Sequence, residues 1–385
     1  MKLLHTSDWH LGRIFNQHSL LEDQAHILKQ ITQQVKDHQV DVVIVAGDIY
    51  DRALPPADAV QLLDRTLSKI INELNTPVVM ISGNHDGAQR LGFGAELFKQ
   101  AGLHLFTSFD DLFNPVILKA PFGHVVIWGI PYCDPEHVND YFDTKVSDHQ
   151  GAQEYVTQRL QEHIAEHFTA NCAHVVVSHS FIAGASTSDS ERPLSIGGAE
   201  CVDADLFKDF TYTALGHLHQ AQFKGYQHVR YSGSPLKYSF SEVSQKKSTT
   251  LVTIKDSKTV EHELLPLKAI RDVRVIEGLF DDILAEGASD PHNLDYVHVK
   301  LTDKHAILDP LTQLRRVYPN ILDLSKATLE RQANDTAQTR EQLARPHIEI
   351  IADFYHNMRG ESLSDEQTKL LASVLNDINK AKQDA

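Results

Sequence analysis

Hydrophobic residues in the first hundred positions form short continuous runs, separated by longer segments in which they recur at regular intervals. The runs lie at 2–6, 41–46 and 77–82, and the last two are rich in β-branched residues. Between them, in 21–39 and 57–74, apolar residues recur every three or four positions, which is the spacing of one helical face. Strands that are apolar on both faces and alternate with helices predict a layered α/β core.

After residue 102 this alternation becomes less regular. Apolar runs at 125–130, 174–178 and 229–232 predict a second set of strands, and one further helical pattern covers 153–167.

From residue 265 the pattern changes again. Strand patterns at 273–276 and 296–301, with short helical patterns near 279–285 and 310–317, predict a small α+β domain. A polar stretch rich in Gln, Asn, Asp and Thr follows and is typical of a linker. We therefore expect a main domain at 1–265, a small α+β domain at 266–326, a linker at 327–344 and C-terminal helices at 345–385.

Length and composition are those of a globular protein. The 385 residues are 42% hydrophobic, enough for one large core and a smaller domain. We find neither a run of about 18 apolar residues nor a signal peptide, so we expect a cytoplasmic protein without a membrane span. Cys133, Cys172 and Cys201 are odd in number and far apart, which favours reduced thiols.

The charge balance restricts how the chain could bind nucleic acid. Lys and Arg number 36 against 52 Asp and Glu, a formal net charge of -16. Because phosphate contacts need basic side chains, this balance argues against binding DNA through a broad basic surface. A DNA substrate would have to be attracted by bound divalent cations or by a basic partner subunit.

Five short motifs lie at or just after the ends of apolar runs, where α/β proteins place ligand-binding residues. Each motif alone is weak, because a chain with 23 histidines contains such pairs by chance. Their order along successive strands is more specific, because the carboxyl ends of these strands can converge on one crevice. The motifs are Asp8-Trp9-His10, Gly47-Asp48, Gly83-Asn84-His85-Asp86, His179 and Gly216-His217-Leu218-His219.

The donor atoms in these motifs indicate a metal site. They combine oxygen and nitrogen without thiolate, which suits manganese, iron or zinc, and they come from Asp8, His10, Asp48, Asn84, His179, His217 and His219. Seven groups are too many for one ion. Two ions about 3.5–4 Å apart need a bridging group, and we expect Asp48, at the end of a central strand, to provide it.

In this order the motifs resemble the signature of the calcineurin-like metallophosphoesterases. The resemblance implies an α-β-β-α layered core, and it implies that His85, which binds no metal, stabilises the transition state or protonates the leaving group. It also divides the ligands, with Asp48 shared, into one set of Asp8, His10 and His219 and another of Asn84, His179 and His217. Asp51 and Asp86 are candidates to orient ligand histidines, and turn-forming roles are the alternative.

Flanking sequence narrows the resemblance to the SbcD family of DNA nuclease subunits. The stretches that carry it are 5–13, 47–51, 216–220 and 231–235. The resemblance covers essentially the whole chain. It implies Mn²⁺-dependent cleavage of DNA ends, hairpins and single strands, by exonuclease and endonuclease action in DNA repair, replication and recombination. The implied partner is the SbcC ATPase, which would confer ATP control on duplex cleavage.

Two predictions concern assembly. The helical patterns at 57–74 and 93–101 flank the second and third motifs, and the resemblance implies that this region pairs two subunits, giving a homodimer within a heterotetramer. A C-terminal apolar stripe is our candidate for partner binding, and packing on its own chain is the alternative. The stripe consists of Leu370, Leu371, Val374, Leu375 and Ile378.

Two other functions stay open. A phosphomonoesterase or cyclic-nucleotide phosphodiesterase would use the same metals, and the acidic charge favours it, whereas the second small domain does not. An assembly subunit that tethers DNA ends is the alternative of another class, and the complete ligand set disfavours it.

Overall fold

The computed structural model describes residues 1–168, 171–191, 201–303 and 305–326, with short pieces of the C-terminal segment at 348, 351–352, 355, 362–364, 366–372 and 374–375. The chain divides into two compact units. The first contains Met1–Val275 and His292–Val297, and the second contains Ile276–Pro291 and His298–Ala385. The linker predicted at 327–344 and most of the C-terminal helices predicted at 345–385 lie outside the described residues.

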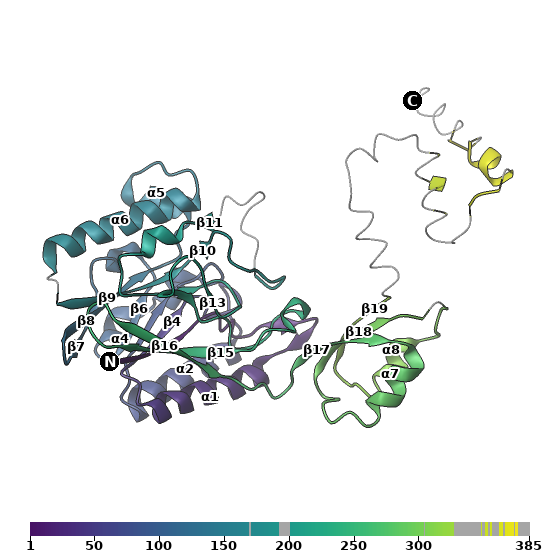
Figure 1. The fold of residues 1–385 in the computed structure, drawn as a ribbon, viewed down its shortest axis with the longest axis horizontal. Coiled ribbons are helices and arrows are strands. Elements are labelled where there is room, and N and C mark those ends of the chain that lie inside the picture. The colour runs from purple at the N-terminus through teal and green to yellow at the C-terminus, as the bar shows by residue number, and fades with distance from the viewer. Residues whose placement is uncertain are drawn as a thin grey trace. The chain divides into compact units, whose positions relative to one another are not determined.

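The first unit contains two six-stranded sheets (Figure 1). In the first sheet four strands run parallel, and two antiparallel strands extend one edge. Its order is β16 (Val260–Pro266), β15 (Ser248–Ile254), β1 (Lys2–Thr6), β4 (Val42–Ala46), β5 (Val78–Ile81) and β6 (Leu103–Phe106).

The second sheet has a parallel centre with an antiparallel strand at each edge. Its order is β13 (Gln222–Phe223), β14 (Val229–Tyr231), β12 (Tyr212–Gly216), β9 (Cys172–His179), β8 (Gly123–Ile130) and β7 (Val116–Ala120). The central strands of both sheets are almost wholly buried, which explains their continuous apolar sequences.

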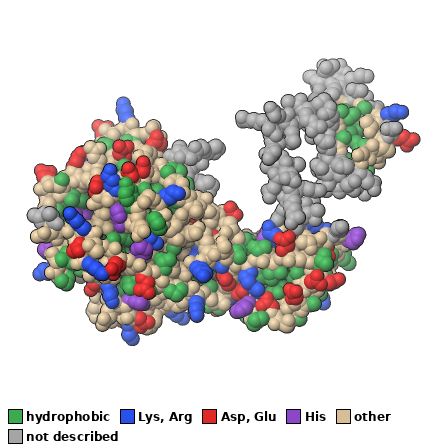
Figure 2. All heavy atoms as spheres, viewed as in Figure 1, with side chains coloured by type: hydrophobic (Ala, Val, Ile, Leu, Met, Phe, Trp, Pro, Cys, Tyr) green, Lys and Arg blue, Asp and Glu red, His purple; other side chains and the backbone are tan. Residues whose placement is uncertain are grey.

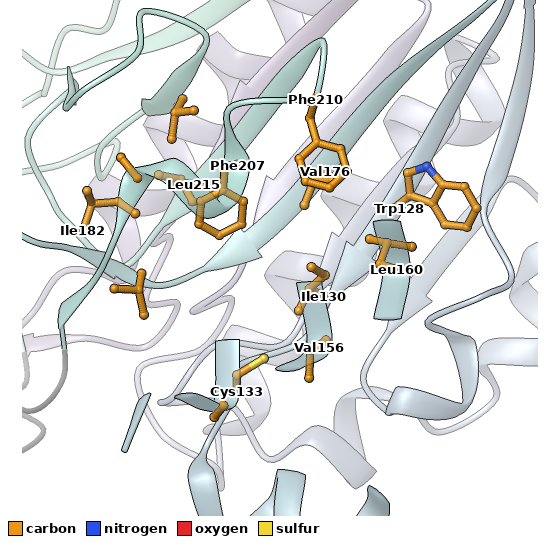
Figure 3. Close-up of a cluster of buried hydrophobic side chains, with 14 of the residues drawn as sticks. Trp128, Ile130, Cys133, Val156, Leu160, Val176, Ile182, Phe207, Phe210 and Leu215 are labelled. Atoms are coloured by element: carbon orange, nitrogen blue, oxygen red, sulfur yellow. The ribbon is translucent and has the colours of Figure 1, made fainter. Parts of the chain in front are cut away.

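The two sheets pack face to face between layers of helices. One core lies between the sheets and includes Val42, Ile44, Val175 and Val177. A second core lies between the second sheet and the helices that cover it, and Figure 3 shows Trp128, Val156, Leu160 and Phe207 in it. Helices α1 (Leu21–His38) and α2 (Ala57–Ser68) cover the first sheet, and α5 (Pro135–Phe142) and α6 (His149–His167) cover the second (Figure 1). The predicted α-β-β-α core is therefore confirmed.

The helices follow the apolar spacing of the sequence, with some different boundaries. Helix α1 (Leu21–His38) buries Ile27, Leu28, Ile31 and Val35 on one face. The helix predicted at 57–74 is α2 (Ala57–Ser68) followed by a π-helix at Lys69–Glu73. The helix predicted at 93–101 is the shorter α4 (Ala95–Lys99), and α3 (Ala88–Leu91) precedes it. The second sheet is covered by α5 (Pro135–Phe142) and α6 (His149–His167).

The second unit is an α+β structure. It has a three-stranded sheet in the order β17 (Val273–Gly278), β18 (Tyr296–Leu301) and β19 (Ile321–Lys326), of which the first residues of β17 and β18 count with the first unit. Helices α7 (Phe280–Gly287) and α8 (Pro310–Leu314) contact each other, and both contribute buried apolar residues.

The first unit also contains the short strands β2 (Ile14–Phe15), β3 (His18–Ser19), β10 (Phe181–Ile182) and β11 (Cys201–Val202).

Cys133, Cys172 and Cys201 are free thiols, as predicted. Within the described ranges, no helix is both long enough and apolar enough to cross a membrane. Acidic and basic side chains are interspersed on the face that Figure 2 shows.

Candidate metal centre

The sequence motifs all lie at the carboxyl ends of neighbouring central strands. In the first sheet, Asp8 and His10 follow β1, Asp48 follows β4, and Asn84 and His85 follow β5. These strands are adjacent and parallel. In the second sheet, His179 ends β9, and His217 and His219 follow the neighbouring strand β12. The face-to-face packing of the sheets brings the two groups of residues together.

One carboxylate oxygen of Asp48 faces three imidazole rings. Its Oδ2 is 3.5 Å from Nε2 of His179, 3.7 Å from Nε2 of His10 and 4.0 Å from Nε2 of His85. The other oxygen, Oδ1, accepts a hydrogen bond of 2.9 Å from the His85 backbone N–H. Asp48 is thus held by the backbone on one side and directed at the histidines on the other.

Three overlapping groups of side chains could hold a cation. Asp8, His10 and His219 form the first group, Asp8, Asp48 and His179 the second, and His10, Asp51 and His85 the third, with the ligand atoms of each group within 4.8 Å of one another. Nε2 of His10 is 3.1 Å from Nε2 of His219, and Oδ1 of Asn84 is 3.0 Å from Nε2 of His179. The first two groups share Asp8, and with the nearby Asp48 they lie side by side.

His217 lies at the edge of this arrangement. Its ring is 5.2 Å from the His179 ring, centroid to centroid, and its backbone N–H donates to Oδ1 of Asp8 at 3.0 Å. Burial lowers the pKa of His217 to about 3, which keeps the ring neutral and able to donate a lone pair. Among the described residues, it is the one predicted histidine ligand outside these three groups.

Several of these residues adopt left-handed backbone conformations that are uncommon for residues other than glycine. Positive φ angles occur at Asp8 (52°), His10 (44°), Asp48 (48°) and His217 (102°). Such conformations cost roughly 1–3 kcal/mol each and are frequent at functional sites. Backbone hydrogen bonds hold them, among them Asp8 N–H to the Gly47 carbonyl at 3.1 Å.

Two motif glycines are required by close packing behind the site. A Cβ atom at Gly216 would lie 1.7 Å from the carbonyl oxygen of Ala46. A Cβ atom at Gly47, where φ is +87°, would lie 2.3 Å from Nδ1 of His179. No side chain fits at either position, so these glycines allow the strands of the two sheets to approach each other.

The residues fit a pair of divalent cations. Asp8, His10, Asp48, His179 and His219 are all buried, and a buried cluster of carboxylates and imidazoles is expensive without a charge to balance it. The donors are oxygen and nitrogen without thiolate, as borderline and hard divalent ions prefer.

The surroundings of Asp8 and Asp48 shift the pKa values of these two carboxylates in opposite directions. Burial raises the pKa of Asp8 to about 6. Burial would also raise the pKa of Asp48, but the neighbouring His179 imidazole outweighs it and holds this pKa well below its ordinary value. Burial by itself would lower the pKa of His179, yet the Asp48 carboxylate raises it to about 9. Asp48 is therefore the carboxylate that most strongly attracts positive charge.

His85 is oriented by backbone groups. Its Nδ1 donates to the carbonyl oxygen of Asp51 at 2.9 Å, so Nε2 is left for a substrate or a proton. Its side chain is 12% exposed, whereas those of His10, His179 and His219 are buried. His85 thus lies on the more open side of the site.

The two aspartates predicted to orient histidines occupy different positions. Oδ1 of Asp51 is 3.7 Å from Nδ1 of His10 but forms its short contact, 2.8 Å, with Arg13. Asp86 accepts hydrogen bonds from the backbone N–H groups of Ile49, Tyr50 and Gly83, and none of these three bonds involves a histidine. Its carboxylate therefore connects the loop that carries Asp48 to the loop that carries Asn84.

The structure also shows residues around His219 that sequence reasoning missed. Oγ of Ser190 is 2.6 Å from Nδ1 of His219, and Glu191 accepts a hydrogen bond of 2.7 Å from the His219 backbone N–H. Glu242 and Lys247 lie behind them as a buried ion pair. These residues follow no ligand motif and no apolar run, so the sequence alone carries no signal for them.

Comparisons with known proteins agree with this geometry. Residues 1–221 match the calcineurin-like phosphoesterase family, and residues 269–359 match the type 5 capsule protein repressor C-terminal domain family. The chain is 37% identical over 387 residues to the SbcD subunit of the nuclease SbcCD from Staphylococcus epidermidis, covering 98% of this chain and 99% of that protein. It is also 37% identical over 376 residues to the protein of that name from Staphylococcus saprophyticus, covering 97% of this chain and 98% of that protein. The chain therefore belongs to the calcineurin-like phosphoesterases and, within them, to the family of SbcD nuclease subunits.

Proposed function

We propose that the chain is the nuclease subunit of an SbcCD-type complex and hydrolyses phosphodiester bonds in DNA with two divalent metal ions. The observation that carries this proposal is the convergence of Asp8, His10, Asp48, His179 and His219 on one buried site. The nearly full-length match to proteins named as SbcCD nuclease subunits supports DNA as the substrate. Such a substrate would place the activity in the cytoplasm.

We assign the ligands as two sets that share Asp48. The contacts of its Oδ2 with both His10 and His179 support this bridging role. Mn²⁺ is the ion that we propose, and the oxygen and nitrogen donors without thiolate suit it. One set adds Asp8, His10 and His219, and the other adds Asn84, His179 and His217.

Two ions held there would supply positive charge that polarises the phosphodiester and lowers the pKa of an attacking water. The protein contributes rigid placement, since backbone hydrogen bonds fix the loops of Asp8 and Asp48. His85 is proposed to donate a proton to the leaving oxygen or to stabilise the charge that develops there. Its fixed Nδ1 and its greater exposure support this role.

DNA affinity is proposed to depend on the partner. With a formal net charge of -16, the lone chain should bind DNA weakly, because few basic groups are available to displace counterions. The SbcC-type ATPase implied by the relatives' name is proposed to supply the additional binding and the ATP control. Tight DNA binding by the lone chain that persists at high salt would contradict this proposal.

The small α+β domain predicted at 266–326 is proposed to hold DNA near the metal site. A family model separate from the phosphoesterase model matches this region, which supports a function of its own. Photocrosslinking of a DNA hairpin to the full chain should yield adducts within 266–326. Adducts confined to 1–265 would exclude this role.

The C-terminal apolar stripe is proposed to bind the ATPase partner. Residues 366–372 are helical, and Leu370 and Val374 are 67% and 46% exposed. Leu371 and Leu375 are partly exposed, and Ile378 lies outside the described residues. Deletion of residues 364–385 should abolish binding of the ATPase subunit in a pull-down and leave hairpin cleavage by the lone chain unchanged. Retained binding would exclude this surface.

A homodimer is proposed through the region around α2, α3 and α4. Phe93 and Leu97 are 83% and 77% exposed there. An apolar groove of about 520 Å³ lies beside them, lined by Leu63, Leu67 and Phe98 among others. Exposed apolar surface of this kind is typical of an interface.

Sedimentation velocity tests the homodimer. At micromolar concentration the wild type should sediment as a dimer, and Phe93→Glu/Leu97→Glu should sediment as a monomer. Leu308→Glu serves as the control, because Leu308 is 89% exposed and lies in the other unit. A monomeric wild type would refute the proposal.

The decisive experiment is cleavage of an end-labelled DNA hairpin by the purified chain in Mn²⁺. Asp48→Ala serves as the inactive control, and a phosphomonoester is tested in parallel. Hairpin cleavage that requires Asp48 and exceeds monoester turnover would support the nuclease. Turnover of the monoester alone would favour the phosphomonoesterase alternative.

A further inference from the structure

A buried ion pair lies behind the metal centre, outside the predicted ligands. Glu242 is 0% exposed, and the side chain of Lys247 is 8% exposed. Oε2 of Glu242 is 2.5 Å from Nζ of Lys247. Burying two charges costs as much as their attraction gains, so such a pair is weak evidence of stabilisation by itself. The contacts that it makes indicate another role.

Both members of the pair contact His219. Nζ of Lys247 donates to the carbonyl oxygen of His219 at 2.8 Å. On the ring side, Oε1 of Glu242 is 3.3 Å from Nδ1 of His219. The pair therefore contacts the backbone and the ring of the same residue.

Ser190 connects the ring to the carboxylate. Its Oγ is 2.6 Å from Nδ1 of His219 and also contacts Oε1 of Glu242. A carboxylate can only accept, so the Ser190 hydroxyl donates to Glu242 and accepts the Nδ1–H of His219. This arrangement places the ring proton on Nδ1 and leaves the lone pair on Nε2. That nitrogen faces Nε2 of His10 at 3.1 Å.

Additional hydrogen bonds fix the pair itself. Glu242 accepts from the hydroxyls of Ser188 and Ser239 at 3.3 and 3.4 Å. Lys247 donates to Oγ of Ser234 at 2.9 Å and to Oε1 of Gln245 at 2.7 Å. The orientation of Glu242 is thus determined by several groups other than the histidine.

We propose that Glu242 and Lys247 are positioning residues that, with Ser190, fix the tautomer and direction of His219 and thereby set the affinity of one of the two metal sites. The inference rests on the proposed two-metal function. The affected site is the one that uses Asp8, His10 and His219. Mutation of a carboxylate that orients a metal-binding histidine in this manner typically lowers metal affinity about 10- to 100-fold.

The variants are chosen so that misfolding does not imitate the effect. Glu242→Gln alone leaves the Lys247 ammonium buried and unpaired, which is strongly destabilising. The double variant Glu242→Gln/Lys247→Met removes both charges together, and Ser190→Ala removes only the connecting hydroxyl. The control is Asp23→Asn, because Asp23 is also buried and its carboxylate contacts Arg271 and Tyr296 rather than the proposed ligands.

Mn²⁺ binding to the full chain is measured by isothermal titration calorimetry, and hairpin cleavage is followed across Mn²⁺ concentrations. The wild type should bind two ions. In both site variants one site should weaken by about 10- to 100-fold while the other is unchanged, and excess Mn²⁺ should restore cleavage. Asp23→Asn should bind both ions as the wild type does.

Three results would overturn the inference. If both variants bind Mn²⁺ at both sites with wild-type affinity, the Glu242–Lys247 pair holds the loop and does not set the affinity of a metal site. Equal weakening of both sites, shared by Asp23→Asn, would indicate general loosening of the fold. A wild type that fails to bind two ions would refute the proposed metal centre, and the inference would fall with it.

Discussion

Replacing Asp86 by asparagine tests how the loops that carry the proposed ligands are held. Oδ2 of Asp86 accepts hydrogen bonds from the Ile49 and Gly83 backbone N–H groups at 3.1 and 2.9 Å, and Oδ1 accepts one from Tyr50 at 2.9 Å. These donors lie next to Asp48 and Asn84 in the sequence. One carboxylate therefore fixes two loops that each carry a proposed ligand.

The expected loss of stability follows from the number of oxygen atoms that can accept a hydrogen bond. The side-chain amide of asparagine has one accepting oxygen, and if this oxygen replaces Oδ2, the Ile49 and Gly83 bonds survive. The Tyr50 N–H then meets an NH₂ group, so one hydrogen bond is lost and a donor is left unsatisfied. We expect the free energy of unfolding to fall by about 1–3 kcal/mol and the affinity for Mn²⁺ to fall by about tenfold.

Urea unfolding and titration calorimetry measure the two effects. The control is Asp134→Asn, which removes the same charge from a carboxylate that caps α5 through Glu136 and His137. Asparagine caps helices as well as aspartate does, so neither stability nor Mn²⁺ affinity should change. If Asp86→Asn binds Mn²⁺ as tightly as this control, the proposed coupling between the two loops is refuted.

Three further predictions concern the same site. His85→Ala should reduce hairpin cleavage by about 10²- to 10⁴-fold without changing Mn²⁺ affinity in calorimetry, and weakened binding would make His85 a ligand instead. Mn²⁺ at 100 times its Kd should raise the free energy of unfolding by about 2.7 kcal/mol per site, and EDTA should reverse this stabilisation. A melting temperature that does not change when Mn²⁺ is added would contradict a metal site. Gly216→Ala should prevent folding because its Cβ would lie 1.7 Å from the Ala46 carbonyl, whereas Gly278→Ala, with a nearest contact of 3.4 Å, should yield soluble protein.

Most of the core strands could be predicted because they are buried on both faces. The runs at 41–46 and 77–82 became β4 and β5, which are fully buried. Strands β6, β7 and β12 were not among the predicted strands, and neither were β15 and β16. Of the last two, β15 begins with Ser248, Thr249 and Thr250, and β16 is largely exposed. Their positions next to β1 and at the sheet edge depend on long-range pairing, which apolar periodicity does not reveal.

The motifs of the candidate metal centre were also visible in the sequence, because residues that follow the ends of parallel strands must lie at one edge of a sheet. The left-handed backbone at Asp8, His10 and Asp48 was not visible. Neither was the role of Asp86, since aspartate after an asparagine is equally compatible with an ordinary turn.

The sequence by itself determined the layered α/β class, the type of donor atoms at the site and, except for β12, the strands that carry them, because each of these is a property of local pattern and residue chemistry. Only the tertiary structure decided that the ends of β1, β4 and β5 face those of β9 and β12, and that Ser190, Glu242 and Lys247 surround His219. Residues so distant along the chain become neighbours only through the packing of two sheets and their loops. The hydrogen bonds between them depend on that packing, so they leave no periodic signal in the sequence.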